Sequence, residues 1–100
     1  MSRVVKVAVL GATGYVGMEL VNFLNNHPNV KINFLGSDSF KNIYLENKNL
    51  KIKYSNLPLL QDNKSFNHLD SDCVFLCLPH SVSNKYVKKF FGKIKIIDLS

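Results

Sequence analysis

The fold of this 100-residue chain is decided by the stretch Val4 to Leu10, V-V-K-V-A-V-L, and the turn Gly11 to Gly17, G-A-T-G-Y-V-G, that follows it. The first part is β-branched and almost continuously apolar, which is typical of a parallel strand covered on both faces. After the turn, apolar residues recur at i, i+3, i+4 and i+7 from Gly17 to Leu24, as on one face of a helix. The sequence therefore predicts a strand, a glycine-rich turn and a helix, in that order.

Three glycines at this spacing have a physical use in binding phosphate. Gly11 permits the sharp turn out of the strand, Gly14 lets the backbone approach a pyrophosphate, and Gly17 lets the helix pack closely. The free N–H groups and positive dipole end of the helix then face the anion, and the Thr13 hydroxyl can add a hydrogen bond. The alternative is an ordinary turn that carries three glycines. The predicted dinucleotide-binding residues of this turn are Gly11, Ala12, Thr13, Gly14, Tyr15, Val16 and Gly17.

The rest of the chain alternates between strand and helix patterns. Pro28 ends the first helix, and a second strand is expected from Val30 to Leu35. A short strand is expected at 50–54, a central parallel strand from Cys73 to Leu78, and a further strand from Ile94 to Leu99. This order predicts an α/β fold, a Rossmann-type doubly wound and mostly parallel sheet, truncated after about the fifth strand.

A second helix is expected between the last two strands. Ser83 is its predicted N-cap, and Gly92 is its predicted C′ residue. Its apolar face is expected to hold Tyr86, Val87, Phe90 and Phe91.

The chain stops at Ser100, directly after a predicted strand. We therefore expect residues 1–100 to be an incomplete N-terminal NAD(P)-binding domain, with the catalytic or substrate domain absent. Alone, such a chain is expected to bind cofactor weakly at most and to turn over no substrate.

The end of the second strand is expected to choose the cofactor. An acidic side chain here binds a ribose 2′-OH and favours NAD, whereas a basic side chain accommodates the 2′-phosphate of NADP. Ser37 and Ser39, with Lys41, offer groups that hold a phosphate, but Asp38 would repel one if it points inward. NADP is the expected cofactor and NAD stays open; a merely solvated loop is the alternative reading.

Composition argues against several other classes of protein. The net charge is +6, but the lysines are scattered, so solvated faces explain them better than nucleic-acid binding. No apolar run approaches the ~20 residues that span a membrane, and no signal peptide is evident, so a cytoplasmic location is the default. Cys73 and Cys77 lie about 13 Å apart in an extended strand, too far for a disulfide. We interpret both cysteines as buried small residues, and we expect no metal site.

Several segments together resemble a known family. They are the glycine turn, Ser37-Asp38-Ser39, the run from Val74 to Ser83, and Ile97 to Ser100. Together they resemble the N-terminal part of the N-acetyl-γ-glutamyl-phosphate reductases, within the semialdehyde dehydrogenase family. Aspartate-semialdehyde dehydrogenases share the glycine turn; Leu-Pro-His followed by Asp-Leu-Ser is the more specific part.

The resemblance implies a two-domain, homo-oligomeric enzyme of arginine biosynthesis that reduces an acyl phosphate to an aldehyde with NADPH and releases phosphate. It implies a nucleophilic cysteine and an assisting histidine beyond Ser100, hence no catalytic residue in this chain. It also places Leu78, Pro79 and His80 near the nicotinamide ribose, although a loop-bracing His80 is the alternative.

The chain departs from the family at two positions. Ser81 replaces a frequent glycine, and Asp38 replaces a frequent arginine. An aspartate-semialdehyde dehydrogenase fragment and a non-catalytic nucleotide-binding module remain the alternative functions.

Overall fold

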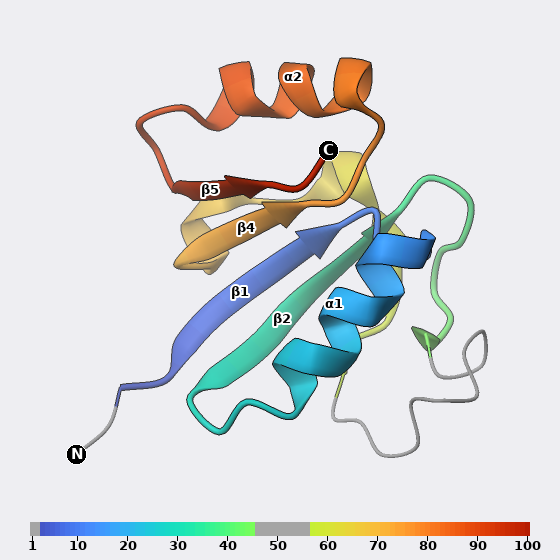
Figure 1. Cartoon of the computed structure of the whole chain (residues 1–100), viewed down its shortest axis with the longest axis vertical. Helices are drawn as coiled ribbons and strands as arrows, with labels where there is room; N and C mark the ends of the chain where they lie inside the picture. The colour runs from blue at the N-terminus through green and yellow to red at the C-terminus, as the bar shows by residue number, and fades with distance from the viewer. Residues whose placement is uncertain (1–2, 46–56) are drawn as a thin grey trace.

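Among the described residues, five parallel strands form a single sheet with the spatial order β3-β2-β1-β4-β5, and Figure 1 shows β2, β1, β4 and β5 side by side in this order. The computed structural model describes residues 3–45 and 57–100. The strands are β1 (Val5–Leu10), β2 (Val30–Ser37), β3 (Leu60–Asp62), β4 (Cys73–Leu76) and β5 (Lys95–Asp98). From β1 the chain builds outward to β2 and β3, and then continues on the other side with β4 and β5. This order confirms the prediction of a Rossmann-type doubly wound sheet and puts its switch point between β1 and β4.

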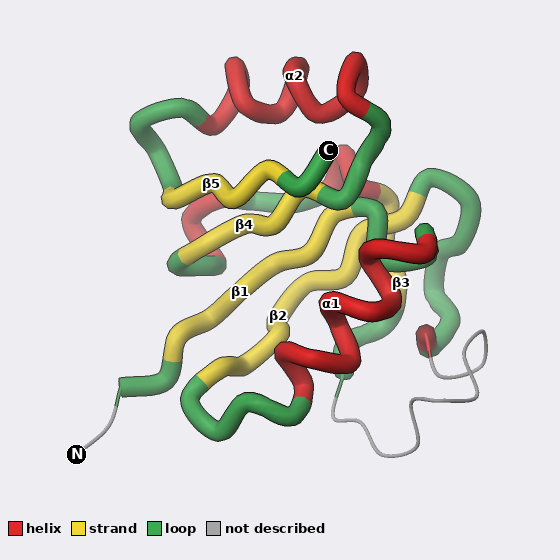
Figure 2. The backbone as a smooth tube through the Cα atoms, in the orientation of Figure 1, coloured by secondary structure: helices red, strands yellow, loops and turns green. Residues whose placement is uncertain are grey.

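The central strand β1 is buried on both faces because its side chains alternate between two cores. Val7 and Val9 belong to the same apolar cluster as Val21 of α1 (Tyr15–Asn25). Ala8 and Leu10 belong to a second cluster, which contains Phe90 of α2 (His80–Phe90). Figure 2 shows α1 running alongside β1 and β2, and α2 alongside β4 and β5. The continuous apolar run of β1 is thus explained by two layers of packing.

Two short 3-10 helices connect β3 to β4, η2 (Asn63–Ser65) and η3 (His68–Asp70). Phe66 between them is buried, with its ring centroid 5.2 Å from that of Phe34 and 5.4 Å from that of Phe90. This aromatic contact fixes the segment after β3 against the α2 face of the sheet.

The start of α2 differs from the prediction. Pro79 is the N-cap residue, and its carbonyl accepts the N–H groups of Val82 and Ser83. Ser83 therefore lies inside the first turn, fully buried, and the prediction that it caps the helix was wrong. The strand β4 already ends at Leu76, so the three residues 77–79 connect it to the helix.

The end of α2 also corrects the predicted apolar face. Phe91 is 80% exposed, because the backbone leaves helical geometry at this residue with φ −53° and ψ 128°. Gly92 follows with φ 77°, which confirms its predicted place as the C′ residue. Tyr86, Val87 and Phe90 do pack in the second apolar cluster.

The third strand was not predicted, and the strand predicted at 50–54 lies outside the described residues. Both cysteines carry free thiols; Cys73 is buried and Cys77 half-buried, as expected of small core residues. Within the described ranges, no helix is long and apolar enough to cross a membrane.

Candidate dinucleotide-binding site

The turn after β1 lies directly against the end of β4. Gly11 has φ 78°, in the left-handed region, and a Cβ built there would overlap the carbonyl oxygen of Cys77. The Cys77 N–H donates to the Leu10 carbonyl at 2.9 Å, which ties the two strand ends together. Gly11 is therefore required by both its backbone angle and its neighbour.

Gly17 is required by packing alone. A Cβ on this residue would overlap the Gly11 carbonyl oxygen and lie 2.9 Å from the Ala12 Cα. Its absence lets the first turn of α1 lie against the glycine turn, as the sequence predicts for the third glycine.

Gly14, in contrast, is not required by the fold. Its φ of −74° and ψ of 168° suit any residue. A Cβ built on it would meet one atom of the described chain within 4 Å, the Gly11 carbonyl oxygen at an ordinary 3.6 Å. The chain thus keeps a glycine where its own packing would accept a side chain, and the space beside the turn stays open. This is the position at which the sequence analysis expects a pyrophosphate to approach the backbone.

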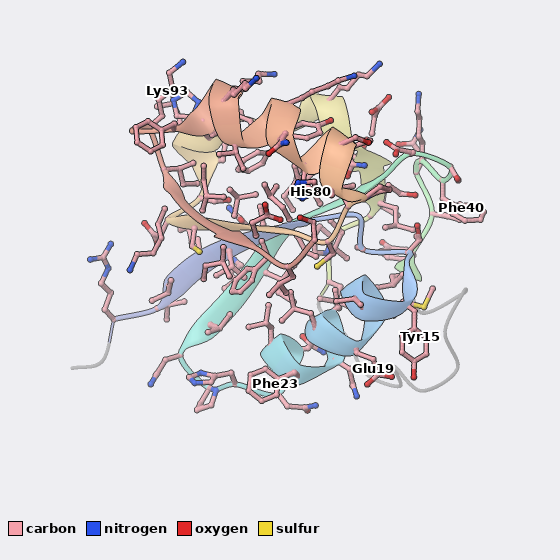
Figure 3. All side chains as sticks on the ribbon, turned by 45° about the horizontal axis from the view of Figure 1, so that its top comes forward. Tyr15, Glu19, Phe23, Phe40, His80 and Lys93 are labelled. Atoms are coloured by element: carbon pink, nitrogen blue, oxygen red, sulfur yellow. The ribbon has the colours of Figure 1, made fainter. Side chains whose placement is uncertain are left out.

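The N-terminus of α1 offers free donors at the same place. Gly14 provides no side-chain cap, and no acidic side chain lies in the first turn. The N–H groups of Tyr15, Val16 and Gly17 have no hydrogen-bond partner among the described residues. Tyr15 is 84% exposed and its ring points away from the body of the molecule (Figure 3). Free N–H groups at the positive end of a helix bind anions.

Two hydroxyls link this turn to the end of β2. Thr13 Oγ1 and Ser37 Oγ lie 3.0 Å apart, and Ser37 Oγ accepts the N–H groups of Ser39 at 3.1 Å and Phe40 at 3.2 Å. Ser37 Oγ already accepts two hydrogen bonds, so the Ser37 hydroxyl donates to Thr13 Oγ1. The Thr13 hydroxyl is then available to donate to another acceptor. Ser37 is fully buried and shapes the loop, whereas Ser39 is exposed.

Asn63 contacts both the glycine turn and the end of β2, and no sequence pattern predicts this role. Its Oδ1 accepts the Gly11 N–H at 3.1 Å, and its Nδ2 donates to Asp38 Oδ1 at 2.8 Å. It is 1% exposed, and a Cβ at Gly36 would overlap its Oδ1. Asn63 therefore couples the glycine turn to the acidic residue at the end of β2.

The second predicted segment, Leu78, Pro79 and His80, lies beside the same turn. Leu78 is buried, and its Cδ2 would lie 2.9 Å from a Cβ at Gly11. Pro79 and His80 are exposed; His80 is the first residue of α2 (Figure 3). The structure thus brings 11–17, 37–39 and 78–80 to the carboxyl edge of the sheet.

A small polar network anchors the start of α2 to the end of β5. The buried Ser83 hydroxyl donates to Asp98 Oδ1 at 2.8 Å, and the Ser100 N–H donates to the same oxygen at 3.0 Å. The hydrogen bonds from Ser100, first its N–H and then its hydroxyl, together with the one from Ser83, hold the pKa of Asp98 below its usual range. His80 Nδ1 lies 3.4 Å from Ser100 Oγ.

Neither of the two cysteine thiols is activated. Burial, with a smaller contribution from Asp98, raises the pKa of Cys77 to about 11, and burial also raises that of Cys73. A nucleophilic thiol needs the opposite shift. In residues 3–45 and 57–100, no three His, Cys, Asp or Glu side chains gather as a metal site would require. What this site offers chemically is the set of N–H donors at the start of α1, which suit an anion.

A glycine turn at the switch point of a doubly wound sheet, with free helix N–H groups beside it, defines a Rossmann-type dinucleotide-binding domain. Comparison with known families gives the narrower class. Residues 6–100 match the model of the semialdehyde dehydrogenase NAD-binding domain, and the chain belongs to this family.

Similar proteins carry the name that the resemblance implies. The chain is 43% identical over 103 residues to an N-acetyl-gamma-glutamyl-phosphate reductase of Ehrlichia chaffeensis. This match covers 100% of the chain and 29% of the relative. It is 43% identical over 99 residues to the enzyme of the same name from Campylobacter jejuni, covering 96% of this chain and 28% of the relative. The chain thus spans less than a third of the length of these relatives.

A solved structure agrees with the fold. Aspartate semialdehyde dehydrogenase with NADP from Candida albicans superposes with a TM-score of 0.75 at 28% identity, over 95% of this chain and 29% of that one.

Proposed function

We propose that this chain is the cofactor-binding part of an NADP-dependent reductase that converts N-acetyl-γ-glutamyl phosphate to N-acetylglutamate semialdehyde and phosphate. The observation that carries the proposal is Gly14, a glycine that the fold itself does not need. The names of the relatives support the choice of substrate.

The turn has the donors that a pyrophosphate requires. The N–H groups of Tyr15, Val16 and Gly17 and the Thr13 hydroxyl would hold its oxygens. Ala12 is buried and donates its N–H to the Gly36 carbonyl at 2.8 Å, so it fixes the turn. Ser37 would act as a positioning residue for Thr13.

The start of α2 would face the nicotinamide half. Pro79 offers exposed apolar surface there, His80 is exposed beside it, and the buried Leu78 supports the segment from below. The Ser83–Asp98 hydrogen bond would hold this segment in place when the cofactor binds.

When bound, the dinucleotide supplies a hydride. This chain's residues bind and orient it. Neither Cys73 nor Cys77 serves as the nucleophile, because Cys73 is buried, Cys77 is half-buried and burial raises the pKa of both thiols. The nucleophilic cysteine and its histidine would belong to a longer protein, in keeping with the small part of its relatives that this chain spans. Its free cysteines suit a reducing compartment, and we propose a cytoplasmic location.

A chimera tests the proposed reaction. This chain replaces the matching segment of the Ehrlichia chaffeensis relative, and the product is assayed in reverse, as phosphate-dependent reduction of NADP⁺ by N-acetylglutamate semialdehyde. We expect activity with this substrate and at least a tenfold lower rate with aspartate semialdehyde. A preference for aspartate semialdehyde would support the alternative enzyme instead.

A second chimera with Gly14→Val separates the cofactor site from the rest of the reaction. The added side chain occupies the open space beside the turn, so we expect loss of activity with the fold retained. An active Gly14→Val chimera would contradict the assignment of the turn.

A further inference from the structure

A groove beside the glycine turn has the charge and shape to bind the adenosine end of the cofactor. It has a volume of about 500 Å³, within the range of small-molecule sites. Its walls come from the ends of β2 and β3, from η2 and from α2. Its lining residues are Asp38, Asp62, Lys64, Val82, Lys85, Tyr86 and Lys89.

The groove is connected to the glycine turn through the buried side chain of Asn63. Asn63 bonds to the Gly11 N–H on one side and to Asp38, a lining residue, on the other. A dinucleotide with its pyrophosphate at the turn extends its adenosine ribose to the end of the second strand. The ribose would therefore lie beside Asp38, at the mouth of this groove.

The charge of the groove favours an anion in spite of Asp38. Asp62 is paired with Lys41, at 3.4 Å between Nζ and Oδ2. The remaining groups are Lys64, Lys85 and Lys89 against Asp38, a surplus of two positive charges. Neither Lys64 nor Lys85 forms an ion pair with another described residue, whereas the Lys89 Nζ lies 5.4 Å from the Phe90 ring centroid.

We propose that Lys64 and Lys85 bind the 2′-phosphate of NADP in this groove. They replace the basic residue that would otherwise stand at the end of β2, where this chain has Asp38. The proposal rests on the proposed cofactor function and adds the residues that select its 2′-phosphate. Val82 and Tyr86, which also line the groove, offer apolar surface for the adenine.

The two lysines come from different elements, η2 and α2, 21 positions apart. A 2′-phosphate between them would be held from two sides, and its charge would offset the repulsion between the two ammonium groups. A 2′-OH gains neither effect, so the lysines should discriminate between the two cofactors.

The test uses two probes that differ only in the 2′-phosphate, 2′,5′-ADP and 5′-AMP, titrated calorimetrically into the 100-residue chain. We expect 2′,5′-ADP to bind at least about tenfold more tightly. Lys64→Ala and Lys85→Ala should each weaken 2′,5′-ADP by about five- to tenfold and 5′-AMP by less than about twofold. Lys88→Ala is the matched control, because Lys88 is an exposed lysine of α2 that does not line the groove.

Asp38→Asn tests the opposing charge. Asparagine still accepts the Asn63 hydrogen bond but carries no charge, so 2′,5′-ADP should bind more tightly and 5′-AMP about as before. Equal affinity for the two probes, or lysine variants that weaken both equally, would overturn the lysine assignment while the cofactor site stands. If Gly14→Val weakens neither probe, or if neither probe binds the folded chain, the proposed function itself fails.

Discussion

The glycines of the turn differ in what they do, and a matched pair of alanine variants measures the difference. At Gly17 a Cβ overlaps the backbone oxygen of Gly11. Alanine gains up to about 1 kcal/mol of helix propensity over glycine, but overpacking costs about 1–3 kcal/mol, and here the obstacle is backbone rather than a flexible side chain. We expect Gly17→Ala to lower the free energy of unfolding by about 1–2 kcal/mol.

At Gly14 the same change should act in the opposite direction. The backbone angles suit alanine, and the nearest atom is 3.6 Å from the built Cβ. Restricting the unfolded chain at such a position stabilises by about 0.4–1 kcal/mol. The two variants should therefore differ by about 1.5–3 kcal/mol, although both remove a glycine from the same turn.

Urea unfolding followed by circular dichroism measures both free energies. With a slope of about 1–3 kcal/mol per molar urea, the two midpoints should lie about 1 M apart. Equal midpoints, or a Gly14→Ala chain less stable than Gly17→Ala, would refute the reasoning from the built Cβ positions.

Three further predictions concern the polar groups and thiols of the site. Ser83→Ala should cost about 1–3 kcal/mol in the unfolding free energy, because the hydrogen bond of a buried hydroxyl to a carboxylate is lost. The same variant should raise the pKa of Asp98 toward its ordinary value of 3.8, which a carboxyl NMR titration measures. Because the pKa of Asp98 is lower in the folded chain than in the unfolded chain, Asp98 contributes stability above pH 3.8, and this contribution is lost as the pH falls through the folded pKa. Cys77, with a pKa of about 11, should react with iodoacetamide at pH 8 at least tenfold more slowly in the folded chain than in urea, as mass spectrometry would measure. Asn63→Leu should destabilise by about 1–3 kcal/mol in urea unfolding, because the Gly11 N–H loses its acceptor; an unchanged midpoint would mean that water replaces the amide.

The strands β1, β2, β4 and β5, the glycine turn and the first helix could be predicted because their signals are local. The apolar run of β1 indicates burial on both faces, and the spacing of apolar residues after Gly17 indicates a helix. Neither prediction requires knowing which elements pack against them. The glycine turn also predicted where the candidate site lies in the fold, since a strand and a helix on either side of it fix where its N–H groups point.

The boundaries of α2 could not be predicted from its apolar spacing. That spacing identifies the buried face but does not say which residue caps the helix. Pro79 is the N-cap residue, so the Ser83 hydroxyl does not cap the helix and donates to Asp98. At the other end, Phe91 continues the apolar pattern but follows the last helical residue, so its side chain turns to solvent.

Asn63 and β3 were missed because their meaning depends on distant residues. The amide of Asn63 bonds to Gly11, 52 positions earlier, and no local pattern shows that a glycine at 36 makes room for it. The strand β3 has three residues and is recognised by its pairing with β2, which is a tertiary property.

The most direct test of the central claim is a titration of the ¹⁵N-labelled chain with NADP⁺, followed by amide chemical shifts. We expect the largest changes at the N–H groups of Tyr15, Val16 and Gly17, with further changes at Ser39 and His80, and none of these in a folded Gly14→Val chain. Shifts confined to other parts of the molecule, or no shifts with either NADP⁺ or NAD⁺ at millimolar concentration, would contradict the assignment of the turn as a dinucleotide site.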